Sequence, residues 1–345
     1  MVANLSLSSK RQIQWINVVR PASKPCPPPL VTASSQVAQI GKKSCNRQGK
    51  PATSQRLVHF PGMDDAQPGR WKNAISALHV LHIYGATALA SFGFVVAIWL
   101  RFDPAPWAGL WFAGSLFAYN IDRLARDPAD AINVPRRAKD AAHLGKYSAA
   151  LAAAALLALI LVPLLRRDWL LLSLVVAGAL VCAAYSVALF GRRLKDLPML
   201  KTFLVPTAIT ASLLVPPLLK EGLHVSTNAF VFASAAVWCF LFFNVLLCDL
   251  RDIEGDMQTG TCSLPVLLGV TGTRRLLVVV IAGTSALCAC SGWNLLATSG
   301  ALYMGSLLVA LRARRSEQFY EWWVEGMLFL PAAICLLHQA GLDSF

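Results

Sequence analysis

The sequence predicts an all-α integral membrane protein built as a bundle of nine transmembrane helices. Hydrophobic residues make up 56% of the chain and charged residues only 14%, a composition that excludes an ordinary soluble domain. Apolar stretches long enough, or nearly long enough, to cross a membrane recur from residue 75 onward. The loops between them alternate in charge: sixteen Lys and Arg follow the even-numbered stretches, and four follow the odd-numbered ones.

A basic tail precedes the membrane domain. Residues 1–63 contain nine Lys and Arg and no Asp or Glu, so much of the net charge of +13 belongs to this segment, and no nucleic-acid partner is expected. We expect residues 1–69 to be disordered, because they show no apolar period and no unbroken apolar run of a secretory signal. Two explanations stay open: a transit-peptide-like leader, or a start codon assigned too early, with the product beginning at Met63. Residues 70–345 form the membrane domain.

The charge asymmetry places the N-terminus on the cytoplasmic side of a membrane, which we expect to be the bacterial inner membrane, with an organelle membrane as the alternative. Most of the nine cysteines lie in apolar runs, so we expect no disulfide and no zinc site. The predicted spans are 75–100, 106–122, 147–165, 168–190, 199–219, 227–249, 275–296, 299–311 and 319–341.

Three aspartates, Asp249, Asp252 and Asp256, end the sixth apolar stretch at spacings of three and four. On one continuous helix, at about 100° per residue, their carboxylates point the same way. Such a stripe of negative charge repels itself, and with Mg²⁺ it becomes a platform for a diphosphate. The alternative is a solvated helix end whose acids form surface ion pairs with Arg251.

A second group of acids, Asp122, Asp127 and Asp130, follows the second apolar stretch. Four spans separate the two groups, so both face the same side of the membrane.

His79 and His82 are less specific signals of function than the acids. The two histidines either contact an acceptor molecule or hydrogen-bond a neighbouring helix, and Glu325 in the last span has no assigned role.

Two segments carry a resemblance to a known family. Asp-Leu-Arg-Asp-Ile-Glu-Gly-Asp at 249–256, with residues 261–269 after it, resembles the second aspartate-rich motif and following loop of the UbiA superfamily of intramembrane prenyltransferases. Ala-Tyr-Ser at 184–186, with the basic residues at 192–201, resembles the segment that this family carries after its fourth helix. The resemblance extends over about residues 70–343 and implies a nine-helix UbiA-type bundle.

The first motif departs from the family pattern Asn-Asp-x-x-Asp-Arg-x-x-Asp. Aligned on the Asp-Arg pair, only Asp122 and Arg123 carry over, and Arg126 stands where an acid is expected. Asp127 lies one residue late and before a proline, which biases it away from helix. Either Asp127 or Asp130 serves as a substitute ligand, or this half of the metal site is weakened.

The resemblance implies Mg²⁺-dependent transfer of a prenyl group from an isoprenoid diphosphate to a small lipophilic or aromatic acceptor within the lipid bilayer. A non-catalytic relative that binds an isoprenoid, or an ion-coupled transporter, are the alternatives. The catalytic residues are then Asp122, Asp249, Asp252 and Asp256. The metal ligands are Asp122, Asp127, Asp130, Asp249, Asp252 and Asp256. The substrate-binding candidates are Asn120, Arg123, Arg136, Arg137, Tyr185, Lys195 and Lys201.

Overall fold

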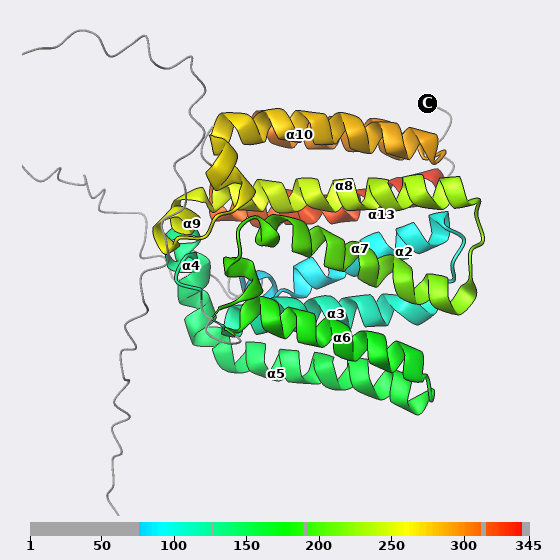
Figure 1. Cartoon of the computed structure of the whole chain (residues 1–345), viewed down its shortest axis with the longest axis horizontal. Coiled ribbons are helices and arrows are strands. Elements are labelled where there is room, and N and C mark those ends of the chain that lie inside the picture. Colours follow the sequence, from blue (N-terminus) through cyan, green and yellow to red (C-terminus); the bar gives the residue numbers. More distant parts are fainter. Residues whose placement is uncertain (1–75, 126, 189–191, 312–314, 340–345) are drawn as a thin grey trace, which may run out of the picture.

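The structure, a computed structural model, describes residues 76–125, 127–188, 192–311 and 315–339. The predicted basic tail and Arg126 lie outside this range. The described chain is helical, and its long helices run side by side along one direction (Figure 1). The predicted all-α class is confirmed.

The elements follow one another along the chain with short connections. Two short 3₁₀ segments, η2 and η4, and one π-helical segment, η3, interrupt the α-helices. The elements are α2 (Ile83–Trp99), α3 (Ala105–Leu124), α4 (Asp130–Asn133), α5 (Pro135–Leu165), α6 (Trp169–Ser186), η2 (Leu194–Asp196), α7 (Leu200–Glu221), α8 (Thr227–Arg251), α9 (Ile253–Thr259), α10 (Leu264–Cys290), α11 (Asn294–Ala310), α12 (Glu317–Phe319), η3 (Tyr320–Val324), η4 (Glu325–Phe329) and α13 (Leu330–Gln339).

The membrane-spanning character follows from helix length and composition. In the described part of the chain, six helical segments are long and apolar enough to cross a membrane: α5, α6, α7, α8, α10 and the composite segment Glu317–Leu337. The helices α2 and α11 are apolar but shorter, and the last turns of α3 carry polar and charged side chains. The multi-pass membrane fold is therefore confirmed, whereas the count of nine spans stays a prediction.

Two helices begin earlier than hydropathy predicts. Helix α5 begins at Pro135, well before the expected start at residue 147, because its first turns are basic and only its later part is apolar. Helix α10 begins at Leu264 rather than near residue 275, with a kink at Gly269, whose φ of 67° is a conformation that glycine adopts without strain. In both cases the helix extends beyond its apolar part.

Helix α8 lies at the centre of the bundle, packed between α7 and α10. Its residues Phe243, Leu246 and Leu247 have no exposed surface. By contrast, α6 at the edge of the bundle exposes apolar side chains such as Trp169 and Leu180, as a lipid-facing helix does. Because lipid is as apolar as these side chains, close packing around α8 rather than exclusion of water holds the centre together.

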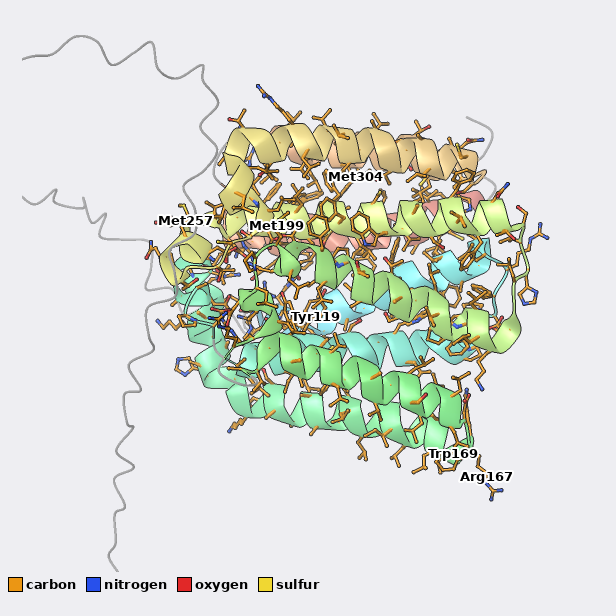
Figure 2. The ribbon with its side chains drawn as sticks, viewed as in Figure 1. Tyr119, Arg167, Trp169, Met199, Met257 and Met304 are labelled. Atoms are coloured by element: carbon orange, nitrogen blue, oxygen red, sulfur yellow. The ribbon has the colours of Figure 1, made fainter. Side chains whose placement is uncertain are left out.

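Both acidic motifs lie at one end of the bundle. The short helices α4 and α9 pack against each other at one end (Figure 1). Met199 and Met257 lie at this end, and Arg167 and Trp169 project from the opposite end (Figure 2). The ends of α3 and α8 and the start of α7 therefore bring both acidic motifs to the same end of the bundle.

Candidate functional site

The second aspartate cluster, Asp249, Asp252 and Asp256, surrounds the side chain of Lys201. The Lys201 Nζ lies 3.3 Å from an Asp249 carboxylate oxygen, 3.9 Å from one of Asp252 and 3.1 Å from Asp256. Asp249 and Asp256 are each only 2% exposed. Three carboxylates therefore converge on one internal cation, in a part of the protein from which water is largely excluded.

The backbone that carries this cluster differs from the predicted single helix. Helix α8 ends at Arg251, Asp252 caps it with φ −88° and ψ 3°, and α9 begins at Ile253. The carboxylates still converge, because Asp249 lies in the last turn of α8 and Asp256 lies in α9. The break at Asp252 turns the chain, and the spacing of three and four is preserved across it.

Neighbouring side chains fix the orientation of two of the carboxylates. The Thr202 hydroxyl donates a hydrogen bond to Asp249 at 2.6 Å, and the Arg251 Nε donates one to Asp252 at 2.7 Å. Thr202 has no exposed surface. Sequence reasoning missed Thr202, although its position directly after Lys201 was a signal that it lies at the same site.

Burial and neighbouring charges shift the pKa values of Asp256 and Asp252 in opposite directions. Burial raises the pKa of Asp256 to about 6, and the charges of Asp252 and Asp249 add to this effect against Lys201. Burial also acts to raise the pKa of Asp252, but Arg251 and Lys201 outweigh it and hold that pKa below its usual value. As the pH falls, Asp256 therefore takes up a proton at a pH at which Asp252 is still ionised.

The first aspartate cluster, Asp122, Asp127 and Asp130, is held by several cations. The Lys195 Nζ lies 2.6 Å from Asp122 and 3.0 Å from Asp127. Arg193 also donates to Asp127, at 2.9 Å. Asp127 thus lies beside Asp122 and shares a lysine with it, and its role as a substitute metal ligand stays a prediction.

Asp130 is placed differently from the other two acids of its cluster. It accepts a hydrogen bond from Arg123 at 3.0 Å. Burial raises the pKa of Asp130, and the charges of Asp122, Asp127 and Asp252 raise it further against Arg123. Since Asp252 belongs to the second cluster, Asp130 lies within electrostatic reach of both clusters.

The segment between α6 and α7 joins the two clusters. Lys195 in η2 contacts the first cluster, and Lys201 at the start of α7 contacts the second. Tyr185, near the end of α6, lies with its ring centre 5.6 Å from the Lys195 Nζ and interacts electrostatically with Asp122, Asp249 and Asp256. The three basic and aromatic residues that sequence predicted from this segment therefore lie between the two clusters.

A close contact between α4 and α9 fixes their spacing. The backbone N–H of Gly255 donates to the Asn133 side-chain oxygen at 2.8 Å. A Cβ at position 255 would come within 2.5 Å of the Asn133 amide nitrogen. Glycine is needed here because the first-motif loop packs directly on its backbone.

The remaining predicted substrate-binding residues contact other groups. Asn120 has no exposed surface, and its amide donates to the backbone carbonyls of Leu81 and Leu116. Arg136 pairs with Glu321 at 2.6 Å, and Arg137 pairs with Glu325 at 3.1 Å. These three residues contact structural partners rather than the carboxylates of either cluster.

His82 lies in this neighbouring network. Both Arg123 and Arg137 place guanidinium nitrogens within 3.3 Å of its ring nitrogens. His79 instead packs against Tyr84 and Trp322. Of the two roles expected for these histidines, contact with an acceptor or with a neighbouring helix, His82 shows the contact with neighbouring helices.

Cys262, just after the second motif, is disulfide-bonded. The prediction that the chain has no disulfide is therefore wrong. That prediction rests on cysteines in apolar runs, whereas Cys262 lies in the connection between α9 and α10. The other cysteines of the described ranges, six in number, are free.

The donor chemistry of the second cluster fits a hard divalent cation. Carboxylate oxygens are the ligands that Mg²⁺ prefers, and the Lys201 ammonium marks the point where they already surround a positive charge. Nowhere in the described ranges are three or more His, Cys, Asp or Glu side chains arranged to hold a metal ion. A metal at this cluster would therefore take the place that Lys201 occupies.

Comparison with known proteins gives one family and one solved structure. A model of the UbiA prenyltransferase family matches residues 128–325, a range that begins after Asp122 and Asp127 and includes both lysines and the second cluster. A structure from work on digeranylgeranylglyceryl phosphate synthase in membranes is 15% identical, with a TM-score of 0.40 over 77% of this chain and 96% of that one. This likeness is too weak to carry an argument.

The comparison with curated proteins found no match. The family match alone spans more than half of the chain. The chain therefore belongs to the UbiA prenyltransferase family and is a multi-pass membrane prenyltransferase.

Proposed function

We propose that this protein transfers a prenyl group from an isoprenoid diphosphate to a small lipophilic or aromatic acceptor, with Mg²⁺ as cofactor. One observation carries the proposal. Two clusters of carboxylates, far apart in sequence, lie at the same end of a membrane-embedded bundle with Lys195, Lys201 and Tyr185 between them. A diphosphate needs this combination of metal-binding acids and nearby ammonium groups.

Each part of the site then has a distinct task. Mg²⁺ held by the carboxylates would supply positive charge to the diphosphate and stabilise the charge that develops as it leaves. Asp249, Asp252 and Asp256 would hold the metal on one side, with Asp122 and Asp127 on the other. The Lys195 and Lys201 ammonium groups each have three N–H donors and can exchange carboxylate oxygens for phosphate oxygens.

The reaction balances without any further reactant. The allylic C–O bond of the donor breaks, and the diphosphate leaves with the electron pair. The allylic cation is attacked by an electron-rich carbon or oxygen of the acceptor, and the acceptor then loses a proton.

A second candidate is a non-catalytic protein of the same family that binds an isoprenoid diphosphate. The observation that favours it is the first cluster, where Lys195 and Arg193 pair with Asp122 and Asp127 and the family match has not yet begun. The ion-coupled transporter is less favoured, because the acids lie at one end of the bundle rather than on broken helices at mid-membrane.

We also propose that the N-terminus faces the cytoplasm of a bacterial cell, or the equivalent side of an organelle membrane, from the distribution of Lys and Arg. With nine spans, Phe345 then lies on the opposite side. A reporter fused after Phe345 tests this orientation: a cytoplasmic signal would show that the span count is wrong by one.

The function is tested with membranes that contain the full chain, incubated with a radiolabelled prenyl diphosphate and a panel of aromatic and lipid acceptors. We expect a labelled lipid product that forms with Mg²⁺ and not in the presence of a chelator. Product formation that is equal with the chelator would overturn the metal-dependent mechanism. Diphosphate binding without product, for every donor and acceptor, would favour the non-catalytic candidate.

A further inference from the structure

A polar pocket lies outside the two aspartate clusters. Its volume is about 420 Å³, and it is bounded by the ends of α8 and α11, the starts of α10 and α12, and α4. Three of the bounding helical segments are candidate membrane spans that begin or end here. The pocket therefore sits at the membrane boundary, at the end of the bundle that also holds α4 and α9 (Figure 1).

Positive charge predominates among the side chains that line the pocket. Arg251, Arg274 and Arg315 contribute guanidinium groups, and Glu254 and Glu317 contribute carboxylates. Glu317 is already engaged, because its carboxylate accepts hydrogen bonds from the backbone N–H groups of Arg136 and Arg137. Arg251 is engaged as well, by Asp252.

Arg274 and Arg315 are the cations that this arrangement leaves available. Among the described residues, neither forms an ion pair. Arg274 donates through one terminal nitrogen to the Leu311 carbonyl at 2.7 Å, and its Nε is buried without a partner. Arg315 donates through Nε to the Ala310 carbonyl at 2.6 Å. Each guanidinium group therefore keeps N–H donors for a further ligand.

The tethering of Arg274 separates it from arginines that only set membrane topology. A topology residue needs no more than exposure to water, as Arg275 has next to it on the same helix. Arg274 is instead partly buried and bound to the end of α11, with its charge facing a space large enough for a ligand. A guanidinium in this position, with N–H donors directed at the pocket, is stabilised by an anion.

We propose that this pocket binds the phosphate group of an anionic amphiphile, with Arg274 and Arg315 as its ligands. Guanidinium groups match phosphate oxygens in geometry and charge. Leu250, Val270 and Leu311 are among the apolar residues of the lining, which suits the first carbons of a lipid beside the phosphate. Basic pockets between helices at a membrane surface bind anionic lipid head groups by this combination.

The experiment uses the purified full chain in a neutral detergent and measures lipid binding by native mass spectrometry, with thermal unfolding as a second readout. Phosphatidylglycerol and phosphatidic acid are compared with phosphatidylcholine, and inorganic phosphate is added as a competitor. We expect at least one anionic lipid to stay bound where phosphatidylcholine does not. Displacement by inorganic phosphate shows that phosphate alone is sufficient, and its failure shows that the lipid portion is needed; both outcomes support a phosphate site.

Arg274→Gln and Arg275→Gln form the matched pair, since they remove the same charge from adjacent positions of α10. We expect Arg274→Gln to weaken anionic-lipid binding at least about fivefold and Arg275→Gln to leave it unchanged. Arg315→Gln, on a different helix, should weaken it as well, and this variant keeps the test decisive if Arg274→Gln fails to fold. Equal effects at 274 and 275, or wild-type binding in Arg315→Gln, would overturn the proposal. Arg251 is not used, because it also binds Asp252.

Discussion

The two aspartate clusters hold their carboxylates in different ways. In the second cluster three carboxylates converge on the single ammonium of Lys201, and two of them are almost fully buried. In the first cluster the acids are divided among several cations, and Asp130 pairs with Arg123 rather than with the lysine that Asp122 and Asp127 share. The second cluster is thus centred on one shared lysine, with Arg251 as a further partner of Asp252, whereas the first cluster has no cation that all of its acids share.

This difference suggests a division of labour. A cluster whose carboxylates converge on one ammonium can exchange that ammonium for a metal ion, since positive charge at its centre relieves the repulsion among the carboxylates. A network of ion pairs can release its acids one at a time as a ligand arrives. We therefore expect the second cluster to dominate Mg²⁺ binding and the first to contribute mainly once the diphosphate is present.

The largest expected effect is that of Asp252→Asn. It removes a carboxylate that stays ionised beside Lys201 and Arg251, and we expect prenyl-transfer activity to fall by about 100-fold or more. Asp103→Asn is the matched control, because that acid lies at the opposite end of the bundle and asparagine keeps its hydrogen bond from the Ala105 N–H. Similar losses in both variants would mean that the acids act only through general electrostatics.

Asp122→Asn should have a smaller effect. Asp122 acts together with Asp127 through Lys195, so its loss leaves one acid on that lysine, and we expect activity to fall about 10-fold to 100-fold. Steady-state rates at saturating donor measure this loss. A decrease as large as that of Asp252→Asn would show that the two clusters contribute equally, against the division proposed above.

Gly255→Ala tests the contact that spaces the two clusters. The added methyl would overlap the Asn133 side chain, and we expect a loss of about 1–3 kcal/mol in unfolding free energy. Thermal unfolding of the purified protein measures it. Combining Gly255→Ala with Asn133→Ala should recover part of the loss, since the overlap is then removed. An additive loss in the double variant would locate the strain elsewhere.

The smallest expected effect is on pH dependence without metal. Because the pKa of Asp256 is raised to about 6, the folded protein binds a proton there that the unfolded chain releases at lower pH. The contribution of this group to stability is therefore lost as pH rises from about 4 to about 6. In a chelator, the difference in Tm between Asp256→Asn and wild type should therefore shift in favour of Asp256→Asn, by a few degrees, as the pH rises from about 4.5 to about 7.5. A constant difference across that range would refute the assignment.

Much of this organisation could be predicted from the sequence, for reasons that lie within short segments. The spacing of Asp249, Asp252 and Asp256 predicted a shared direction, and the structure keeps it although α8 ends between the first two. Lys195 and Lys201, which the sequence marks as substrate-binding candidates, lie beside the acids in the structure. The prediction of helix starts failed where the first turns are charged, as in α5, because hydropathy detects only the apolar part of a helix.

The features that the sequence could not predict depend on residues far apart in the chain. Asn133 and Gly255 form a hydrogen bond across 122 positions, and Arg137 and Glu325 pair across 188. The same applies to Lys201, whose sequence neighbours predicted a phosphate ligand but not its place among three carboxylates. Such pairings follow from how the helices pack, which no local pattern specifies.

The central claim is that both clusters bind one diphosphate and that Mg²⁺ is required for it. It is tested most directly by the binding of a non-hydrolysable prenyl diphosphate analogue to the purified chain, measured by calorimetry with Mg²⁺ and with a chelator. We predict binding only with Mg²⁺, abolished in Asp249→Asn and weakened in Asp122→Asn. Tight binding in the chelator, or unchanged binding in Asp249→Asn, would contradict the account.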